Sequence, residues 1–152
     1  MSVFDPESFL NSEQQGALDT QLIPAPEGEW NAQIEEITPR AITDKNGEER
    51  ALLNITWNIM DQEVAQHTGR DRNTVRQAVF LDLTDEGALD MSKGKNVQLG
   101  QLREALGQND PKKAWKPADM QGQMAKVRVS HRPDQNDPNI IYADVKKVTK
   151  AA

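Results

Sequence analysis

Residues 53–59 read Leu-Asn-Ile-Thr-Trp-Asn-Ile, and this stretch decides the fold class of the chain. Its apolar residues, Leu53, Ile55, Trp57 and Ile59, recur at every second position. Successive side chains of a β-strand point to opposite faces, so this alternation predicts a strand with one buried face and one polar face. We therefore expect Trp57 in the core of a mainly β protein.

The chain before this strand predicts its hairpin partner. Apolar and polar residues alternate from Gly28 through Trp30 to Ile34, and the next apolar residue is then Ile37. An alternation that slips by one residue is typical of a β-bulge, which a sheet needs in order to curve. The segment Asp44–Gly47 contains Asn-Gly, a dipeptide that is favoured in tight hairpin turns. Trp30 begins the apolar face of this strand, and we expect it in the core.

The chain after residue 59 predicts three more strands. A polar loop over residues 61–73 leads to a third strand over Thr74–Thr84, and the fourth and fifth strands cover Gln123–Arg132 and Ile140–Val148. We expect the third strand to direct Val75, Val79, Leu81 and Leu83 toward the core. On the fifth strand we expect one face to carry Ile141, Ala143 and Val145.

A helix is predicted between the third and fourth strands, capped by Asn96 and ended by Gly107. Its apolar side would comprise Val97, Leu99, Leu102, Ala105 and Leu106. The predicted fold is a five-stranded barrel of the oligonucleotide/oligosaccharide-binding (OB) type, in the order β-β-β-α-β-β, whose helix closes one end. The barrel domain would span residues 24–150, preceded by an extended, partly disordered arm over residues 1–23 with a short helix over Phe9–Leu18.

The charge of the chain is unevenly distributed. The net charge is −6, yet residues 1–29 contain six acidic residues and no Lys or Arg, so this segment accounts for all of it. Residues 110–150 hold nine basic and five acidic side chains, which makes the C-terminal third locally basic. An overall negative charge therefore does not exclude an anionic ligand. The acidic arm has two interpretations, a binding segment for protein partners or a solubilising segment.

The sequence contains no pattern that indicates catalysis. Neither His67 nor His131 has a second histidine at helical spacing, and no glycine-rich phosphate loop is present. Adjacent carboxylates such as Glu35 and Glu36 would point to opposite faces of a strand, so they cannot act on one bond. Asp134 and Asp137 form a solvated loop tip or a weak cation site. We expect no enzyme activity, no cofactor and no structural metal.

Aromatic and basic side chains on the outward faces of the last three strands indicate a nucleic-acid interface. Proteins that bind single strands combine a basic groove, which neutralises phosphates, with rings on which bases stack. The predicted DNA-binding residues are Arg70, Arg72, Arg76, Phe80, Lys112, Lys113, Trp115, Lys126, Arg128, Tyr142 and Lys146. For Phe80 the alternative is packing against the helix or the arm. For Trp115 the alternatives are a loop that clamps the strand and a side chain that covers the barrel end.

Three segments resemble small single-stranded-DNA-binding proteins encoded by tailed phages. Pro24, Pro26 and Glu27–Trp30 look like the Pro-x-Pro-Glu-Gly-Glu-aromatic start of the first strand, and Leu102–Gly107 looks like that family's helix end. Gly122–Val129 resembles the basic, valine-rich strand that follows. The resemblance covers roughly residues 22 to 148. It implies an OB barrel, single-strand binding and a role in phage replication or recombination.

These observations together predict a protein that coats single-stranded DNA without reading its sequence. We expect it in the cytoplasm of an infected bacterial host, where replication or recombination proteins would bind the arm, and we expect no membrane contact because the chain lacks an apolar stretch of about 18 residues. Two alternatives stay open: an accessory module that binds only proteins, and a phage structural or assembly protein.

Overall fold

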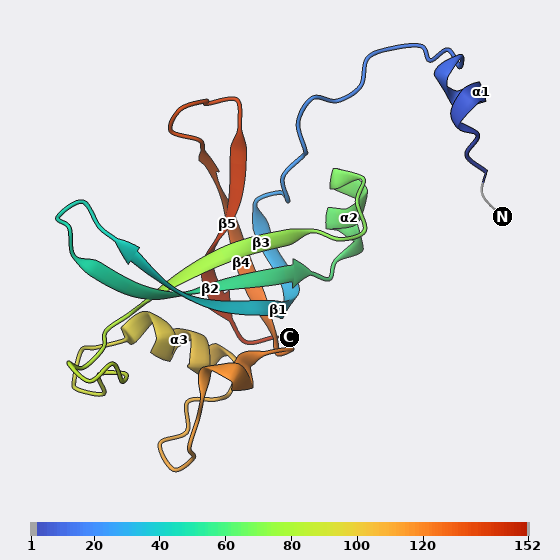
Figure 1. Ribbon diagram of the computed structural model, residues 1–152. Coiled ribbons are helices and arrows are strands. Elements are labelled where there is room, and N and C mark those ends of the chain that lie inside the picture. Colours follow the sequence, from blue (N-terminus) through green and yellow to red (C-terminus); the bar gives the residue numbers. More distant parts are fainter. Residues whose placement is uncertain (1–2, 152) are drawn as a thin grey trace.

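Four antiparallel strand pairings and one parallel pairing close a small barrel in the computed structural model, which describes residues 3–151 (Figure 1). The strands are β1 (Gly28–Thr43), β2 (Glu49–Ile59), β3 (Thr74–Leu81), β4 (Met124–Pro133) and β5 (Ile141–Thr149). Their order around the barrel is β1-β2-β3-β5-β4. The mainly β fold with an OB-type barrel, predicted from the order of elements, is therefore confirmed.

The long strand β1 serves both sides of the barrel because it bends at a bulge. Its first half pairs with β4, from Gly28 to Gln33, and its second half continues along β2 to Thr43. The β1–β2 register shifts between Ile34 and Glu36, which leaves Glu35 as the extra residue. This is the bulge that the slipped alternation predicted, and it lets one strand join two parts of the closed sheet.

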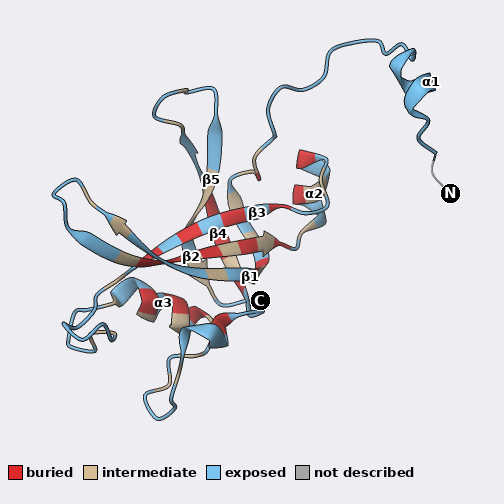
Figure 2. Cartoon of the chain, viewed as in Figure 1, coloured by how far each residue is buried: buried red, intermediate tan, exposed pale blue. Residues whose placement is uncertain are grey.

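The core fills the barrel with the inward residues that the alternation predicts. Ile55 and Trp57 of β2 are fully buried, together with Val79 of β3 and Val127 of β4. Trp30 is half-buried and packs against this cluster, so both tryptophans predicted in the core contribute to it. Figure 2 shows the buried residues along β2 and β3 and on the barrel side of the helices, while the hairpins and the arm are exposed.

Each end of the barrel is covered by a helix. Helix α3 (Val97–Ala105) lies below the barrel in Figure 1 and buries Leu99, Leu102 and Ala105. Helix α2 (Gln62–Thr68) lies between β2 and β3 in the chain and buries Val64 in the core. The prediction of a plain polar loop over residues 61–73 was therefore wrong. Asp61 caps α2 through the N–H of Glu63, and Gly69 ends it with a φ of 74°.

Several local predictions around α3 were also wrong. Leu83 is 42% exposed because β3 ends at Leu81, beyond which the chain turns away from β2. Val97 is exposed as well. Asn96 starts the helix without capping it: the residue has a φ of 54°, and its side chain bonds the backbone of Asp82 and Asp90 instead. Gly107 does end the helix, with a φ of 70°.

Two local features of the hairpins also differ from the sequence-based expectation. The turn after β1 forms at the expected place, but within it only Gly47 has a positive φ. The N–H of Asp44 donates to the carbonyl of Glu48, so the hairpin has a three-residue loop rather than the two-residue turn typical of Asn-Gly. Strand β5 carries a bulge that was not predicted: Arg128 pairs with Lys147 and Val129 with Val145, which leaves Lys146 as the extra residue. Val145 and Val148 both pack on the core as a result.

The segment before β1 is fastened to the barrel by three hydrogen bonds. The indole of Trp30 donates to the carbonyl of Pro26 over 2.9 Å, and His131 of β4 bonds Ala25 and Glu27. A Cβ on Gly28, which has a φ of 148°, would lie 3.0 Å from the Trp30 ring. The proline- and glycine-containing start of the first strand thus has a structural role in locking the chain to β4.

The arm before this point extends away from the barrel (Figure 1). Its helix, α1 (Pro6–Leu10), is capped by Asp5 and begins with Pro6, so the predicted helix over Phe9–Leu18 was wrong in place and length. The described part of the arm, from residue 3 to residue 23, is exposed throughout, and residues 1 and 2 of the predicted arm lie outside the described residues. No helix within residues 3–151 is long and apolar enough to cross a membrane.

Candidate nucleic-acid interface

The outer surface of β2 and β3 joins that of β5 to form a face with aromatic and basic side chains. Register places Leu52 of β2 between Arg40 of β1 and Phe80 of β3. Arg76 of β3 in turn pairs with Asp144 of β5. We call this surface the arginine–aromatic face. Its members are Arg40, Arg50, Leu52, Asn54, Thr56, Arg76, Ala78, Phe80, Arg132, Tyr142 and Asp144.

One end of this face carries a guanidinium over a phenyl ring. The carbon at the centre of the Arg50 guanidinium lies 4.6 Å from the centroid of the Phe80 ring. Phe80 is 38% exposed, whereas its cross-strand neighbour Leu52 is only 5% exposed although it also faces outward. Phe80 therefore lies beside Leu52 and under Arg50, with part of its ring in solvent.

The other end carries a second pair of the same kind. The Arg132 guanidinium lies 5.0 Å from the centroid of the Tyr142 ring and forms an ion pair of 2.7 Å with Asp144. The Tyr142 hydroxyl donates to Asp134 over 2.7 Å. The ring is therefore held by Arg132 over its face and by Asp134 at its hydroxyl, and at 41% exposure it still reaches solvent. Hydrogen bonding fixes this ring more firmly than contact alone would.

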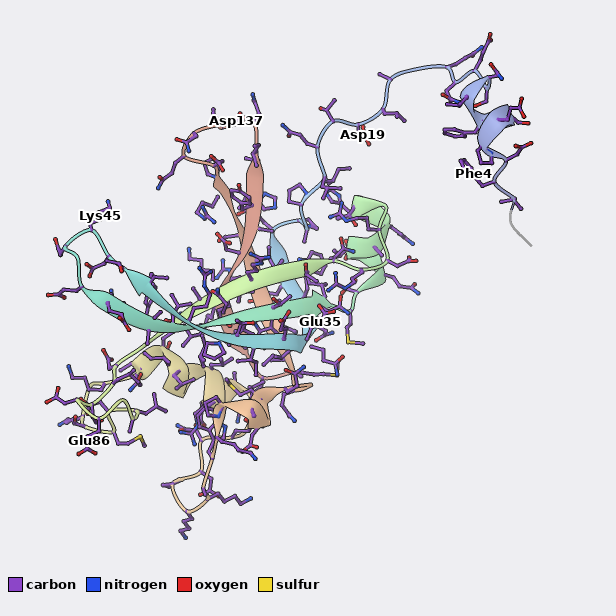
Figure 3. All side chains as sticks on the ribbon, in the orientation of Figure 1. Phe4, Asp19, Glu35, Lys45, Glu86 and Asp137 are labelled. Atoms are coloured by element: carbon purple, nitrogen blue, oxygen red, sulfur yellow. The ribbon has the colours of Figure 1, made fainter. Side chains whose placement is uncertain are left out.

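The two pairs lie far enough apart to contact several nucleotides. Phe80 follows Arg76 by four residues, and Tyr142 precedes Asp144 by two on the parallel neighbour β5. Six residues of strand correspond to roughly 20 Å. Arg76 lies between the two rings, and Arg40, Arg50 and Arg76 take part in no ion pair within residues 3–151. Both long hairpins project beyond the barrel, with Lys45 and Asp137 at their tips (Figure 3).

The hydrogen bond between Tyr142 and Asp134 shifts the pKa of both groups. The pKa of Tyr142 is raised above its usual value because its hydroxyl donates to Asp134 and the carboxylate charge opposes ionisation of the phenol. The pKa of Asp134 is lowered because the carboxylate accepts from Tyr142 and from the backbone N–H of Asn136. Around neutral pH the phenol is therefore protonated and the carboxylate is charged, which is the combination that the bond requires.

Replacing Asp134 with asparagine should lower the pKa of Tyr142 toward its usual value, because the carboxylate charge is lost while the loop cap is kept. Tyr142 is the single tyrosine of the chain, so the near-ultraviolet absorbance of tyrosinate during a pH titration reports this group alone. The Tyr142 midpoint of the wild type should lie at the higher pH, with circular dichroism verifying the fold. Equal midpoints would show that Tyr142 is not bonded to Asp134.

Two predicted site residues, Arg70 and Arg72, make structural contacts at the end of the barrel that α2 covers. Arg70 donates from its guanidinium to the carbonyl of Ile23 over 2.7 Å, which holds the end of the arm. One guanidinium nitrogen of Arg72, Nη2, donates to both carboxylate oxygens of Glu35, the bulged residue of β1, and each distance is 2.7 Å. Figure 3 shows Glu35 at the end of the barrel that α2 covers. The structure does not bring either arginine to the arginine–aromatic face.

Three further predicted residues lie at the opposite end of the barrel. Trp115 is half-buried against the core, its indole donates to Gln108 over 3.0 Å, and Arg103 stacks on it at 4.1 Å. Of its two alternatives, the structure therefore favours a tryptophan that covers the barrel end. Lys112 and Lys113 are exposed on the loop beside it. This loop is on the α3 side in Figure 1, away from the β4–β5 hairpin.

The last three predicted residues lie further along β4 and β5. Lys126 and Arg128 pair outward with Thr149 and Lys147, beyond the single bridge that joins β5 to β3. Lys146 is the bulged residue of β5. Arg76, Phe80 and Tyr142 are thus the predicted residues that the structure brings onto one face. Arg40, Arg50 and Arg132 belong to that face but were missed, because only strand register reveals which arginine lies against which ring.

Comparison with known proteins gives limited similarity. No family model matches the chain. A stretch of 84 residues is 33% identical to part of the arginine--tRNA ligase of Paracoccus denitrificans (strain Pd 1222). The match covers 55% of this chain and 14% of the ligase, so the chain spans a small fraction of that relative. Within residues 3–151, no group of three His, Cys, Asp or Glu side chains is placed to hold a metal ion.

Proposed function

We propose that this protein binds single-stranded DNA without sequence preference, on the arginine–aromatic face, in phage replication or recombination. The observation that carries the proposal is the placement of two arginine–aromatic pairs at the two ends of one barrel face, with Arg76 between them. The β2–β3 surface and the two hairpins that border it are also where OB barrels bind oligonucleotides. The protein acts by binding rather than by catalysis, in the host cytoplasm.

The face suits a flexible polyanion for two physical reasons. Every base has a π-face, so exposed rings such as Phe80 and Tyr142 stack on any sequence, and guanidinium planes do the same. Arginines that are not ion-paired are free to contact phosphates. Between its ends the face carries Asn54, Thr56 and Ala78, with Thr38 and Glu36 of the neighbouring strand β1 beside Asn54 and Thr56.

The affinity for a dT oligomer should fall with salt in proportion to the number of phosphates contacted. If three to four arginines contact phosphates, the slope of log affinity against log salt concentration should be about −2 to −3. Affinity should then fall about 20- to 50-fold between about 50 mM and about 200 mM salt. Fluorescence anisotropy with labelled dT, mixed-sequence, double-stranded and RNA oligomers would measure this. Equal affinity for mixed sequence is expected, and weaker affinity for the duplex.

Arg76→Ala should reduce the magnitude of that slope by about 0.7, since one phosphate contact is lost. Lys113→Ala is the matched control, because it removes a cation on the loop at the α3 end. A protein with no affinity for any oligomer would instead be an accessory or assembly protein. A Lys113→Ala effect as large as that of Arg76→Ala would show that the DNA does not bind where we propose.

The arm is the proposed contact for replication or recombination proteins. Helix α1 presents Phe9 and Leu10, which are largely exposed, beside the acidic Asp5 and Glu7. Because it is separated from the barrel by an extended segment, this short acidic and apolar element is accessible to a second protein while DNA occupies the barrel (Figure 1).

A further inference from the structure

A crevice opens where β3 and β5 separate. The two strands meet at a single bridge, Arg76 with Asp144, and the bulge at Lys146 then turns β5 away. Helix α3 spans the gap from below and is fixed there by Gln98, whose amide donates to the carbonyl of Ala78 over 3.1 Å. The space enclosed by the two strands and the helix has a volume of about 520 Å³. That volume is typical of a site for a small ligand.

The floor of the crevice contains a buried amide that has hydrogen-bonding capacity left over. Gln77 of β3 is only 8% exposed and lines the crevice. Its Oε1 accepts from the indole N–H of Trp57 over 3.0 Å. Because an indole nitrogen only donates, the amide oxygen has to face Trp57 and the amide nitrogen has to face elsewhere. Within residues 3–151 no acceptor bonds that nitrogen, so two N–H donors are left without a partner on a residue that lines the crevice.

The rim of the crevice is positively charged. Arg128 of β4 and Lys146 and Lys147 of β5 line it, and none of the three forms an ion pair within the described part of the chain. The bulge places two consecutive lysines at this position, where a regular strand would direct them to opposite faces. Three cations around one small space favour an anionic ligand.

The other lining groups narrow the ligand class. Gln101 and Glu104 of α3 add an amide and a carboxylate, while Leu102 and Val148 add an apolar wall. A bare phosphate would bind the three cations and would leave the amides, the carboxylate and the apolar wall without a role. The edges of a nucleobase, in contrast, pair with amides and carboxylates, its flat face packs on apolar groups, and its phosphate binds Arg or Lys.

We propose that this crevice binds a single nucleotide, with its phosphate at Arg128 and Lys147 and its base toward Gln77. The site is separate from the arginine–aromatic face. It deepens the proposed function, on which it rests, by providing a place for the terminal nucleotide of a bound strand; a free mononucleotide has the same chemistry.

Titration of the full chain with dAMP, dTMP and inorganic phosphate, followed by NMR amide shifts or calorimetry, tests the proposal. Both mononucleotides should bind more tightly than phosphate. Arg128→Ala and Lys147→Ala should each weaken dAMP binding about tenfold, as expected for a charge-assisted hydrogen bond. Lys126→Ala is the matched control, because this lysine lies on the same strand but outside the crevice, and it should change nothing.

Gln77→Glu is the sharpest variant. It keeps an oxygen that accepts from Trp57 but replaces the two N–H donors with a carboxylate oxygen, so dAMP binding should fall at least tenfold while the melting temperature verifies the fold. Unchanged dAMP binding in a folded Gln77→Glu protein would overturn the proposal, because Gln77 would then serve Trp57 alone. If that variant does not fold, the Arg128 and Lys147 variants decide the outcome.

A 5′-phosphorylated and an unphosphorylated dT oligomer distinguish the two sources of the nucleotide. Tighter binding of the phosphorylated oligomer, lost in Arg128→Ala, would indicate a strand end; equal binding would indicate a free nucleotide. Phe80→Ala should weaken oligomer binding and leave dAMP binding unchanged, so failure of the face and failure of the crevice are separable. Phosphate binding as tightly as dAMP, or no binding of dAMP or dTMP, would overturn the proposal.

Discussion

Trp57→Ala should destabilise the protein by about 3–5 kcal/mol, a large part of the 5–15 kcal/mol that holds a typical domain folded. Trp57 is fully buried, and its cross-strand neighbours Ile34 and Val75 are buried as well, so the substitution would leave a cavity in the core. The substitution also removes the hydrogen-bond donor to Gln77. Urea unfolding followed by circular dichroism would measure the loss.

Trp57→Phe separates the two contributions, because it fills most of the space but cannot donate. It should cost about 1–3 kcal/mol, the amount expected when a buried acceptor loses its partner. Phe9→Ala is the control: it removes a ring from exposed helix α1, and the free energy of unfolding should change by less than about 0.5 kcal/mol. A Trp57→Ala loss below about 1 kcal/mol would mean that Trp57 does not occupy the core.

The strands could be predicted from the sequence because each one buries a single face of the barrel. Period-two alternation is then forced on the chain, as residues 53–59 show, and the bulge at Glu35 appears as a change of phase. The second bulge left a weaker signal: Val145 and Val148 are three residues apart, but the residues between them are both lysines, so no apolar position marked the shift.

The two short helices could not be predicted from periodicity. Helix α1 has five residues and α2 has seven, too few for a 3.6-residue pattern to repeat. Only the residues at their ends indicate these helices in the sequence: Asp5 and Pro6 at the start of α1, and Asp61 and Gly69 at the two ends of α2. These cap residues also occur in ordinary loops, which is why the buried Val64 was missed as the apolar contact that holds α2 on the barrel.

The candidate site could be predicted only in part, because it depends on which strands are neighbours. Strand β5 lies between β3 and β4, so Arg76, Phe80 and Tyr142 come onto one surface. Lys126 and Arg128 alternate outward as expected but lie past the point where β3 and β5 separate. Arg50 and Arg132 acquire their places from cross-strand register, a property of pairs of strands that no single segment displays.

Replacing Phe80 and Tyr142 together with alanine should nearly abolish binding to a dT oligomer. Each stacked ring contributes about 1–3 kcal/mol by alanine substitution, so the pair should weaken binding by at least about 30-fold at constant salt. The rings are roughly 20 Å apart, with no contact between them, and the two losses should therefore be close to additive. Fluorescence anisotropy of the single and double variants would measure both.

Each ring is stacked with an arginine in the free protein, and this contact sharpens the test. A base that stacks on Phe80 either displaces Arg50 or packs on the guanidinium plane of Arg50, and in both cases the phenyl ring supports the base. Arg50→Lys should therefore reduce oligomer affinity less than Phe80→Ala does. Tyr142→Phe keeps the ring without the bond to Asp134, and Phe9→Ala removes a ring from the arm. Both controls should stay within about twofold of the wild type in affinity. A double alanine variant that has the urea midpoint of the wild type and still binds the oligomer as tightly would show that DNA does not bind on the arginine–aromatic face.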